Sequence, residues 1–139
     1  MSNPTDELTI LNALVTKLET ITGLNAYAFP TTNMITPWAV PMLTIPYDDD
    51  WNARTGPIKG RIMVFCKVGT TQSGAKELLE FTSATGSKSI HQKLISDRTL
   101  SGACVDLRSP GPLDDAYLVM NNEGEATFWA RSIAIEIYT

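Results

Sequence analysis

The chain is poor in the side chains that most often carry chemistry. Its 139 residues include one histidine and two cysteines, and none of these lies in a CxxC or comparable ligand cluster. The run Asp48, Asp49 and Asp50 lacks the alternating oxygen ligands and the closing glutamate of a calcium loop. We therefore expect neither a metal site nor a bound cofactor.

Excess positive charge and long apolar runs are also missing. Eleven Lys and Arg residues against fifteen Asp and Glu residues give a net charge of −4 at pH 7, whereas proteins that read nucleic-acid sequence carry a basic face. No apolar run approaches the ~20 residues that span a bilayer, and the acidic N-terminus lacks the basic run of a signal peptide. We expect no specific nucleic-acid binding and no membrane partner, and a protein used in a cytoplasm or in a particle assembled there.

The composition otherwise fits one ordinary globular domain over residues 1–139. Hydrophobic residues make up 43% and charged residues 19% of the chain, and a chain of this length buries roughly two thirds of its unfolded surface. Such a chain folds without cross-links, so we predict that Cys66 and Cys104 are buried free thiols rather than a disulfide.

Hydrophobic spacing predicts one helix near the N-terminus and a pair of helices in the middle of the chain. The first has leucine-rich positions at three- and four-residue steps and ends near Gly23. The pair covers residues 70–97, with a break near Thr85–Gly86. We assign its inward positions to Leu78, Leu79, Thr82, Ile90, Leu94 and Ile95.

Six strands are predicted around these helices. Segments 25–29 and 38–46 lie in a proline-rich region, which must run at a sheet edge or through loops because proline cannot donate a ladder hydrogen bond. Residues 47–60 are predicted to form a polar loop. Further strands cover residues 58–68, 102–109, 116–122 and 125–139. Residues 121–124 (Asn-Asn-Glu-Gly) join the last two strands as a hairpin turn. In the closing strand, one face carries Trp129, Ile133, Ile135 and Ile137.

The order of these elements indicates the fold class. Helix, strands, helix pair and strands follow one another without regular βαβ alternation. This order predicts an α+β fold: a mostly antiparallel sheet with an N-terminal helix and a central helix pair packed on one face.

His91 is the obvious candidate for a catalytic base. General-base chemistry needs a nucleophile and an orienting acid within hydrogen-bond reach, and Ser89, Ser96, Asp97 and Asp106 are near in sequence. No GxSxG nucleophile elbow is present, and a position one residue after Ile90 places His91 on the exposed side of its helix. We predict no catalytic residue and no enzyme. A small α+β enzyme or ligand-binding domain that uses His91 and Asp97 stays the alternative of a different class.

Aromatic residues suggest a surface for other proteins. Trp38 and Trp51 flank the proline-rich edge region, and Phe65 is expected on the solvent face of its strand. Aromatic residues on edges and loops are common interface anchors, and the alternative is that they pack inside the domain. The predicted interface residues are Trp38, Trp51, Arg54 and Phe65.

Several stretches together resemble the tail-terminator or tail-completion (neck) proteins of long-tailed phages. They are the opening helix, "LNAYAFPTTNMITPWAVPMLTIPYDDDW", "GRIMVFCKV", the helix pair, "SIHQKLISDRTLSGACVDLRSPG" and the closing "FWARSIAIEIYT". The resemblance covers nearly the whole chain as an ordered pattern. It implies that the turn from Asp97 to Gly102 is a fold device, in which Asp97 ends a helix, Leu100 tucks onto the core and Gly102 permits a bend.

The resemblance also implies a function without catalysis. Such proteins form a ring, typically hexameric, at the head-proximal end of the tail tube, where they end tube polymerisation and meet the head connector. The implied partners are other copies of the chain, the tail tube protein and the head–tail connector, with DNA passing through the lumen unbound. Asp48, Asp49 and Asp50 are predicted to face that channel. The implied location is the virion neck, assembled in the host cytoplasm. Another neck component, such as a connector or stopper, is the nearest alternative.

Overall fold

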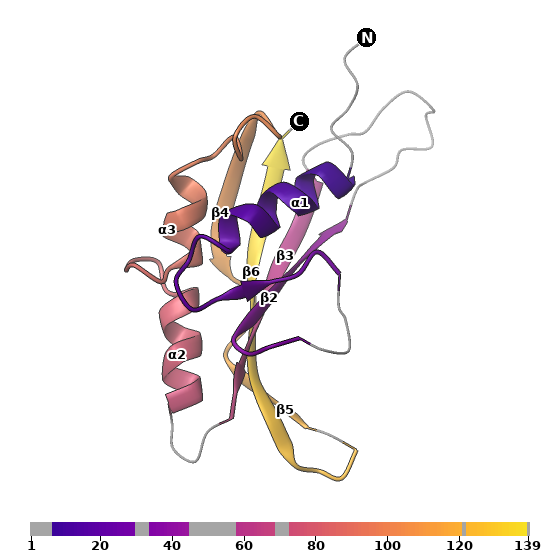
Figure 1. Cartoon of the computed structure of the whole chain (residues 1–139), viewed down its shortest axis with the longest axis vertical. Helices are drawn as coiled ribbons and strands as arrows, with labels where there is room; N and C mark the ends of the chain where they lie inside the picture. The colour runs from indigo at the N-terminus through magenta and orange to yellow at the C-terminus, as the bar shows by residue number, and fades with distance from the viewer. Residues whose placement is uncertain (1–6, 30–33, 45–57, 69–72, 121, 139) are drawn as a thin grey trace.

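A computed structural model describes residues 7–29, 34–44, 58–68, 73–120 and 122–138. They form one sheet with three helices packed on it (Figure 1), which confirms the predicted α+β class. The helices are α1 (Glu7–Leu18), α2 (Ser73–Thr82) and α3 (Ile90–Ile95). The strands are β1 (Asn25–Ala26), β2 (Trp38–Thr44), β3 (Ile58–Lys67), β4 (Asp106–Pro112), β5 (Tyr117–Met120) and β6 (Ala126–Tyr138).

The strand order is β1-β2-β3-β6-β4, and β5 also pairs with β6. All neighbours are antiparallel except β1 and β2, which are parallel. The long strand β6 is therefore flanked by β3 on one side and by β4 and then β5 on the other. The hairpin of β5 and β6 projects past the end of α2, at the lower end of the molecule in Figure 1.

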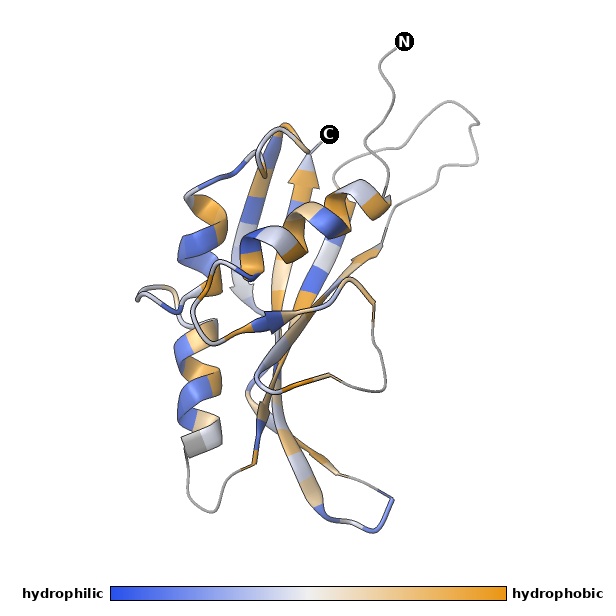
Figure 2. Ribbon diagram, viewed as in Figure 1, coloured by the Kyte–Doolittle hydropathy of each residue, from blue (hydrophilic) through white to orange (hydrophobic). Residues whose placement is uncertain are grey.

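The core lies between the helices and one face of the central strands. The register places Ile58 of β3 opposite Ile137 of β6, and Ile62 opposite Ile133. All four are buried in one cluster with apolar residues of the three helices. Figure 2 shows the matching pattern, with polar residues on the outer sides of α2 and α3. The predicted inward face of the closing strand is thus confirmed.

Two predicted inward positions of the helix pair are wrong. Leu79 is 47% exposed and Ile95 is 38% exposed, while Phe81, which was not predicted, is 1% exposed. In α2 the buried positions Leu78, Phe81 and Thr82 follow three- and four-residue spacing, and Leu79 lies about 100° away from Leu78 around the helix axis. The predicted break between the helices is confirmed, because Gly86 adopts a φ of 112° between α2 and α3.

The first strand in the proline-rich region is shorter than predicted, and the second lies at the predicted edge. Strand β1 has two residues in place of five, and within the described residues β2 ends at Thr44. The N–H groups of Asn25 and Tyr27 donate to the carbonyls of Pro37 and Ala39, so odd-numbered residues of β2 face β1. Pro41 shares that side, beyond the end of β1, and its missing N–H leaves no ladder bond unmade.

The strand predicted at residues 102–109 begins and ends later, as Asp106–Pro112. Leu100, Ser101 and Gly102 all have positive φ, so the chain is still turning where the prediction began the strand. Pairing starts where the N–H of Val105 donates to Tyr138 O. Strand β4 then continues through two prolines with an irregular register, which an edge strand tolerates.

The remaining boundaries are closer to the prediction. Strand β5 covers Tyr117–Met120 in place of 116–122, and β6 covers Ala126–Tyr138 in place of 125–139. The hairpin turn lies where it was predicted, with Gly124 at a φ of 80°. None of the helices in the described ranges has the length and apolarity that crossing a bilayer requires.

Candidate functional site

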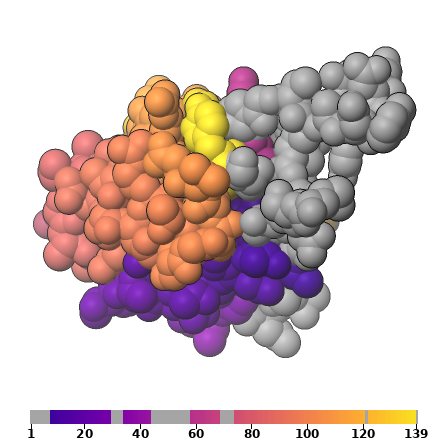
Figure 3. All heavy atoms as spheres, turned by 90° about the horizontal axis from the view of Figure 1, so that it is seen from above, coloured from indigo at the N-terminus to yellow at the C-terminus, as the bar shows by residue number. Residues whose placement is uncertain are grey.

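The turn after α3 is built around the carboxylate of Asp97. Its Oδ1 accepts the backbone N–H of Ser101 at 3.2 Å, and its Oδ2 accepts the Ser101 hydroxyl at 3.1 Å. Lys17 of α1 places its Nζ 3.1 Å from Oδ2. Figure 3 shows α1 in indigo lying beside the orange segment around this turn. One side chain thus closes the turn and ties it to α1, while Leu100 packs into the core, as expected for a fold device.

These contacts lower the pKa of Asp97 below its ordinary value of 3.8, chiefly through the backbone hydrogen bond from Ser101 and then through Lys17. Because the carboxylate is more acidic in the folded chain than in the unfolded one, its stabilisation is complete above pH 3.8. It is lost as the pH falls through the lower, folded-state pKa.

We expect Asp97→Asn to lower the thermal midpoint at neutral pH, because the anion that Ser101 and Lys17 stabilise is gone. The difference from the wild type should shrink as the pH falls below 3.8. Circular-dichroism melts over a pH series measure it, and Lys17→Met should reproduce part of the loss. A difference that stays constant down to low pH would contradict this role of the carboxylate.

The candidate partners of His91 each make a structural contact. The Ser89 hydroxyl accepts the N–H of Gln92 at 3.1 Å, which caps α3, and it donates to Ser83 O at 2.6 Å. The hydroxyl of Ser96 donates to Lys93 O at 2.6 Å. His91 itself is partly buried on α3.

The second acid, Asp106, is also engaged. Arg98 donates to both of its carboxylate oxygens, from Nε at 2.9 Å and from Nη2 at 3.0 Å. The side chains that could have formed a triad with His91 are thus the caps and ion pairs of α3 and its turn. No group of three or more His, Cys, Asp and Glu side chains able to hold a metal ion occurs in the part of the chain that the structure describes.

The two thiols are free and buried, as predicted. Burial, followed by the charge of Glu77, raises the pKa of Cys66 to about 12. Burial, followed by the charge of Asp106, raises the pKa of Cys104 to about 11. At neutral pH both side chains are protonated, and the thiolate is the reactive form.

We therefore expect the folded protein to resist thiol reagents at mildly alkaline pH and to release two reactive thiols in strong denaturant. Measuring the labelling rate by mass spectrometry checks this expectation. The rate should follow the unfolding rate when small amounts of denaturant are added. Fast modification of either cysteine in the native state would contradict it.

Two of the predicted interface aromatics lie together. Trp38 stacks on Phe65 with ring centroids 4.1 Å apart, and both contact Phe128 edge to face. Trp38 is 8% exposed, so within one chain most of its ring is covered. Phe128 was not among the predicted interface residues, although its position two residues before Ala130 placed it on the face opposite the isoleucines. Trp51, Arg54, Asp48, Asp49 and Asp50 lie outside the described residues.

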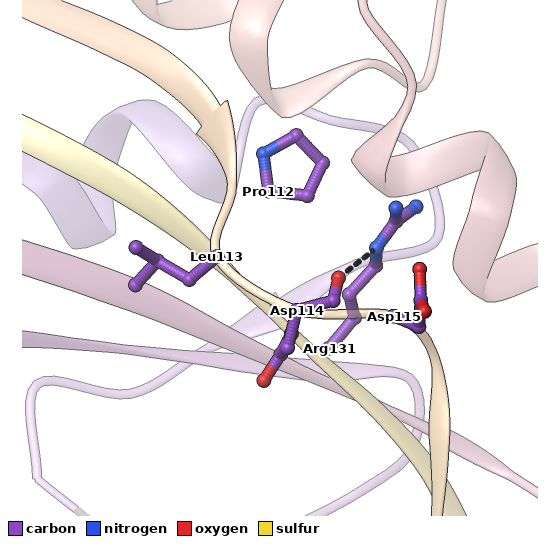
Figure 4. A pocket seen from close by; sticks show the side chains of 5 residues that line it. All are labelled: Pro112, Leu113, Asp114, Asp115 and Arg131. Atoms are coloured by element: carbon purple, nitrogen blue, oxygen red, sulfur yellow. Dashed lines mark hydrogen bonds between the residues drawn. The ribbon is translucent and has the colours of Figure 1, made fainter.

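A shallow hollow of about 410 Å³ lies where β4 gives way to β5 (Figure 4). Arg131 lines it and donates from Nε to the carbonyl of Asp114 at 2.9 Å and from Nη1 to Thr82 Oγ1 at 3.2 Å. Asp114 Oδ1 accepts the N–H of Ser132 at 3.0 Å. These hydrogen bonds hold the joint between the two edge strands and connect it to α2.

Comparison of the chain with models of known protein families found no match, and comparison with curated protein sequences found none either.

One open edge of the described sheet is the outer side of β5, residues Tyr117–Met120, which we call the β5 edge. Among the described residues β5 pairs only with β6, and its four side chains are uncharged. Leu118 is 42% exposed and Met120 is 55% exposed. Natural sheets protect exposed edges with charges, prolines, bulges or short strands. Strand β5 is short and its register with β6 shifts between Val119 and Met120, but it carries no charge and no proline, so apolar side chains stay open to solvent along it.

Proposed function

We propose that this protein is a structural subunit of a phage neck. Copies of it form a ring, typically hexameric, at the head-proximal end of the tail tube. The ring ends tube polymerisation and presents a surface to the head connector, while DNA passes through its lumen without specific contacts. The subunit performs no catalysis and acts in the virion after assembly in the host cytoplasm.

The observation that carries this proposal is the β5 edge. It joins four uncharged residues, a row of backbone groups with no partner strand among the described residues, and a hairpin that projects from the body of the domain. Pairing of such an edge with another chain gives main-chain hydrogen bonds as well as burial of apolar side chains. A protein that works by contacting copies of itself and a tube needs surfaces of this kind.

The contacts around His91 support the proposal from another direction. Asp97 and Ser89, which a ligand-binding domain would need for chemistry beside His91, close a turn and cap a helix. These contacts use the residue pattern "SIHQKLISDRTLSG" for folding, which is the role that the phage resemblance implies for it.

The direct test uses the tail tube protein encoded in the same genome as this chain. Tubes are polymerised from that protein alone and with this protein added, and their ends are viewed by negative-stain electron microscopy. We expect added density at one end and shorter, more uniform tubes. Unchanged tube lengths with bare ends would contradict the proposal. Binding to a purified portal ring but not to tubes would point to a connector instead.

A further inference from the structure

We infer that the β5 edge of one copy pairs with the outer side of β2 in a second copy. The outer side of β2 at residues 41–43 is called the β2 edge. The contact is heterologous, because two different patches meet. The inference rests on the proposed ring function and names the surfaces that close such a ring.

The edge segments of the sheet differ in how they are protected. Strand β4 contains Pro110 and Pro112, and the β2 edge contains Pro41. Strand β5 contains neither a proline nor a charged residue. Each edge proline removes one donor, so two β2 edges pair poorly with each other. Every residue of β5 has an N–H, so a contact between β5 and the β2 edge loses fewer ladder bonds to proline than a contact between two β2 edges.

The backbone of β5 is oriented for such a contact. The N–H of Leu113 donates to Ser132 O, so even-numbered residues of β6 face β4 and β5. Tyr117 lies opposite Ala130 and bonds inward. By strand alternation, the N–H and C=O of Leu118 point away from β6, along the β5 edge.

Charge selects the second copy's β2 edge rather than its β5 edge. Acidic residues precede and follow β5: Asp114, Asp115, Glu123 and Glu125. Two β5 edges pairing with each other would bring these acidic ends together, which is unfavourable. Exposed Lys59 and Arg61 of β3 lie directly beside β2, with Arg61 opposite Met42. The second copy therefore supplies two positive charges next to the edge that β5 would extend, with Glu136 opposite Lys59 on the side of β3 away from β2.

The first experiment compares Leu118→Lys with Leu79→Lys by light scattering. Both convert a half-exposed leucine to lysine, but only Leu118 lies on the β5 edge. We expect the wild type and Leu79→Lys to form oligomers. We expect Leu118→Lys to have the mass of one chain, 15.2 kDa. Leu118→Pro, which removes an outward donor and no donor to β6, should do the same while keeping the wild-type circular-dichroism spectrum.

A mixing experiment tests whether two different patches meet. A Lys59→Glu, Arg61→Glu double variant has a changed β2 edge region, and Leu118→Lys has a changed β5 edge. Each alone should be monomeric, and an equal mixture should form dimers and nothing larger, because one intact patch remains on each partner. Oligomers formed by the double variant alone would overturn the heterologous contact.

The outcome is separable from that of the tube experiment. A wild type that stays monomeric at chain concentrations up to about 1 mM, or a Leu118→Lys variant that still forms oligomers, overturns this inference. Capping of tubes by either protein would leave the proposed function standing. Failure of the wild type to cap tubes, with the pairing confirmed, would overturn the function and keep the contact.

Discussion

Phe81→Ala is expected to reduce the free energy of unfolding by about 3–5 kcal/mol. The ring is 1% exposed in the cluster that joins α2 to β3 and β6, and Lys88 Nζ lies 5.7 Å from its centroid on the outer side. Removing the ring leaves a cavity that the helix and sheet cannot close without moving the backbone. Urea unfolding followed by circular dichroism measures the loss, and the slope with denaturant should stay unchanged.

Leu79→Ala in the same helix is the matched control. Leu79 is 47% exposed, so its truncation should change the free energy of unfolding by no more than about 0.5 kcal/mol. The pair of variants separates loss of core packing from a change in helix propensity, because both substitutions introduce alanine into α2. Equal losses from the two variants would contradict the observed orientation of the helix.

The error over Leu79 shows what periodicity alone cannot decide. In "KELLEFT" two adjacent leucines compete for the inward position, and either could begin a stripe with spacing of three or four. Packing against the sheet determines which leucine is buried. Strands β3 and β6 offer a fixed apolar surface, and the helix turns the larger set of Leu78, Phe81 and Thr82 toward it. Local spacing therefore predicted that α2 is a helix, but not which of its faces packs against the sheet.

Alternation was more informative in β6 than in any other segment. Ile133, Ile135 and Ile137 occupy every second position, so a single register buries all three. The Asp97–Gly102 turn was expected only from the phage resemblance, although its hydrogen bonds join residues within a few positions of each other. Strand β4 was misplaced because its start depends on where Val105 meets Tyr138, a contact between segments over thirty residues apart.

The β5 edge could not be predicted from the chain for a similar reason. "YLVM" indicates a strand, but a strand with this composition is as suitable for the middle of a sheet as for its edge. Only the pairing of β4 and β5 along the same side of β6 leaves it open. The sequence identified Trp38 and Phe65 as aromatic residues in an edge region and on a solvent-facing side of a strand. Their contact with Phe128 could not be predicted, because it depends on the register of β2, β3 and β6.

The sheet edge that would receive β5 depends on a close approach between β2 and β3, and Gly60→Ala is expected to disrupt it. A Cβ at Gly60 would overlap the carbonyl oxygen of Met42 and lie 2.9 Å from Leu43 Cδ2. A backbone atom cannot rotate away, so β2 must shift from its place beside β3. We expect a loss of at least about 2 kcal/mol in the free energy of unfolding and faster amide exchange in β2.

Two further variants identify the cause. Leu43→Ala combined with Gly60→Ala should not restore stability, because the overlap with the Met42 carbonyl remains after the leucine side chain is removed. Lys67→Ala, at an exposed position of the same strand, should stay within about 0.5 kcal/mol of the wild type. Recovery in the double variant would show that only the leucine side chain obstructs the methyl group. In that case β2 would keep its position beside β3, and exchange in its amides would be unchanged.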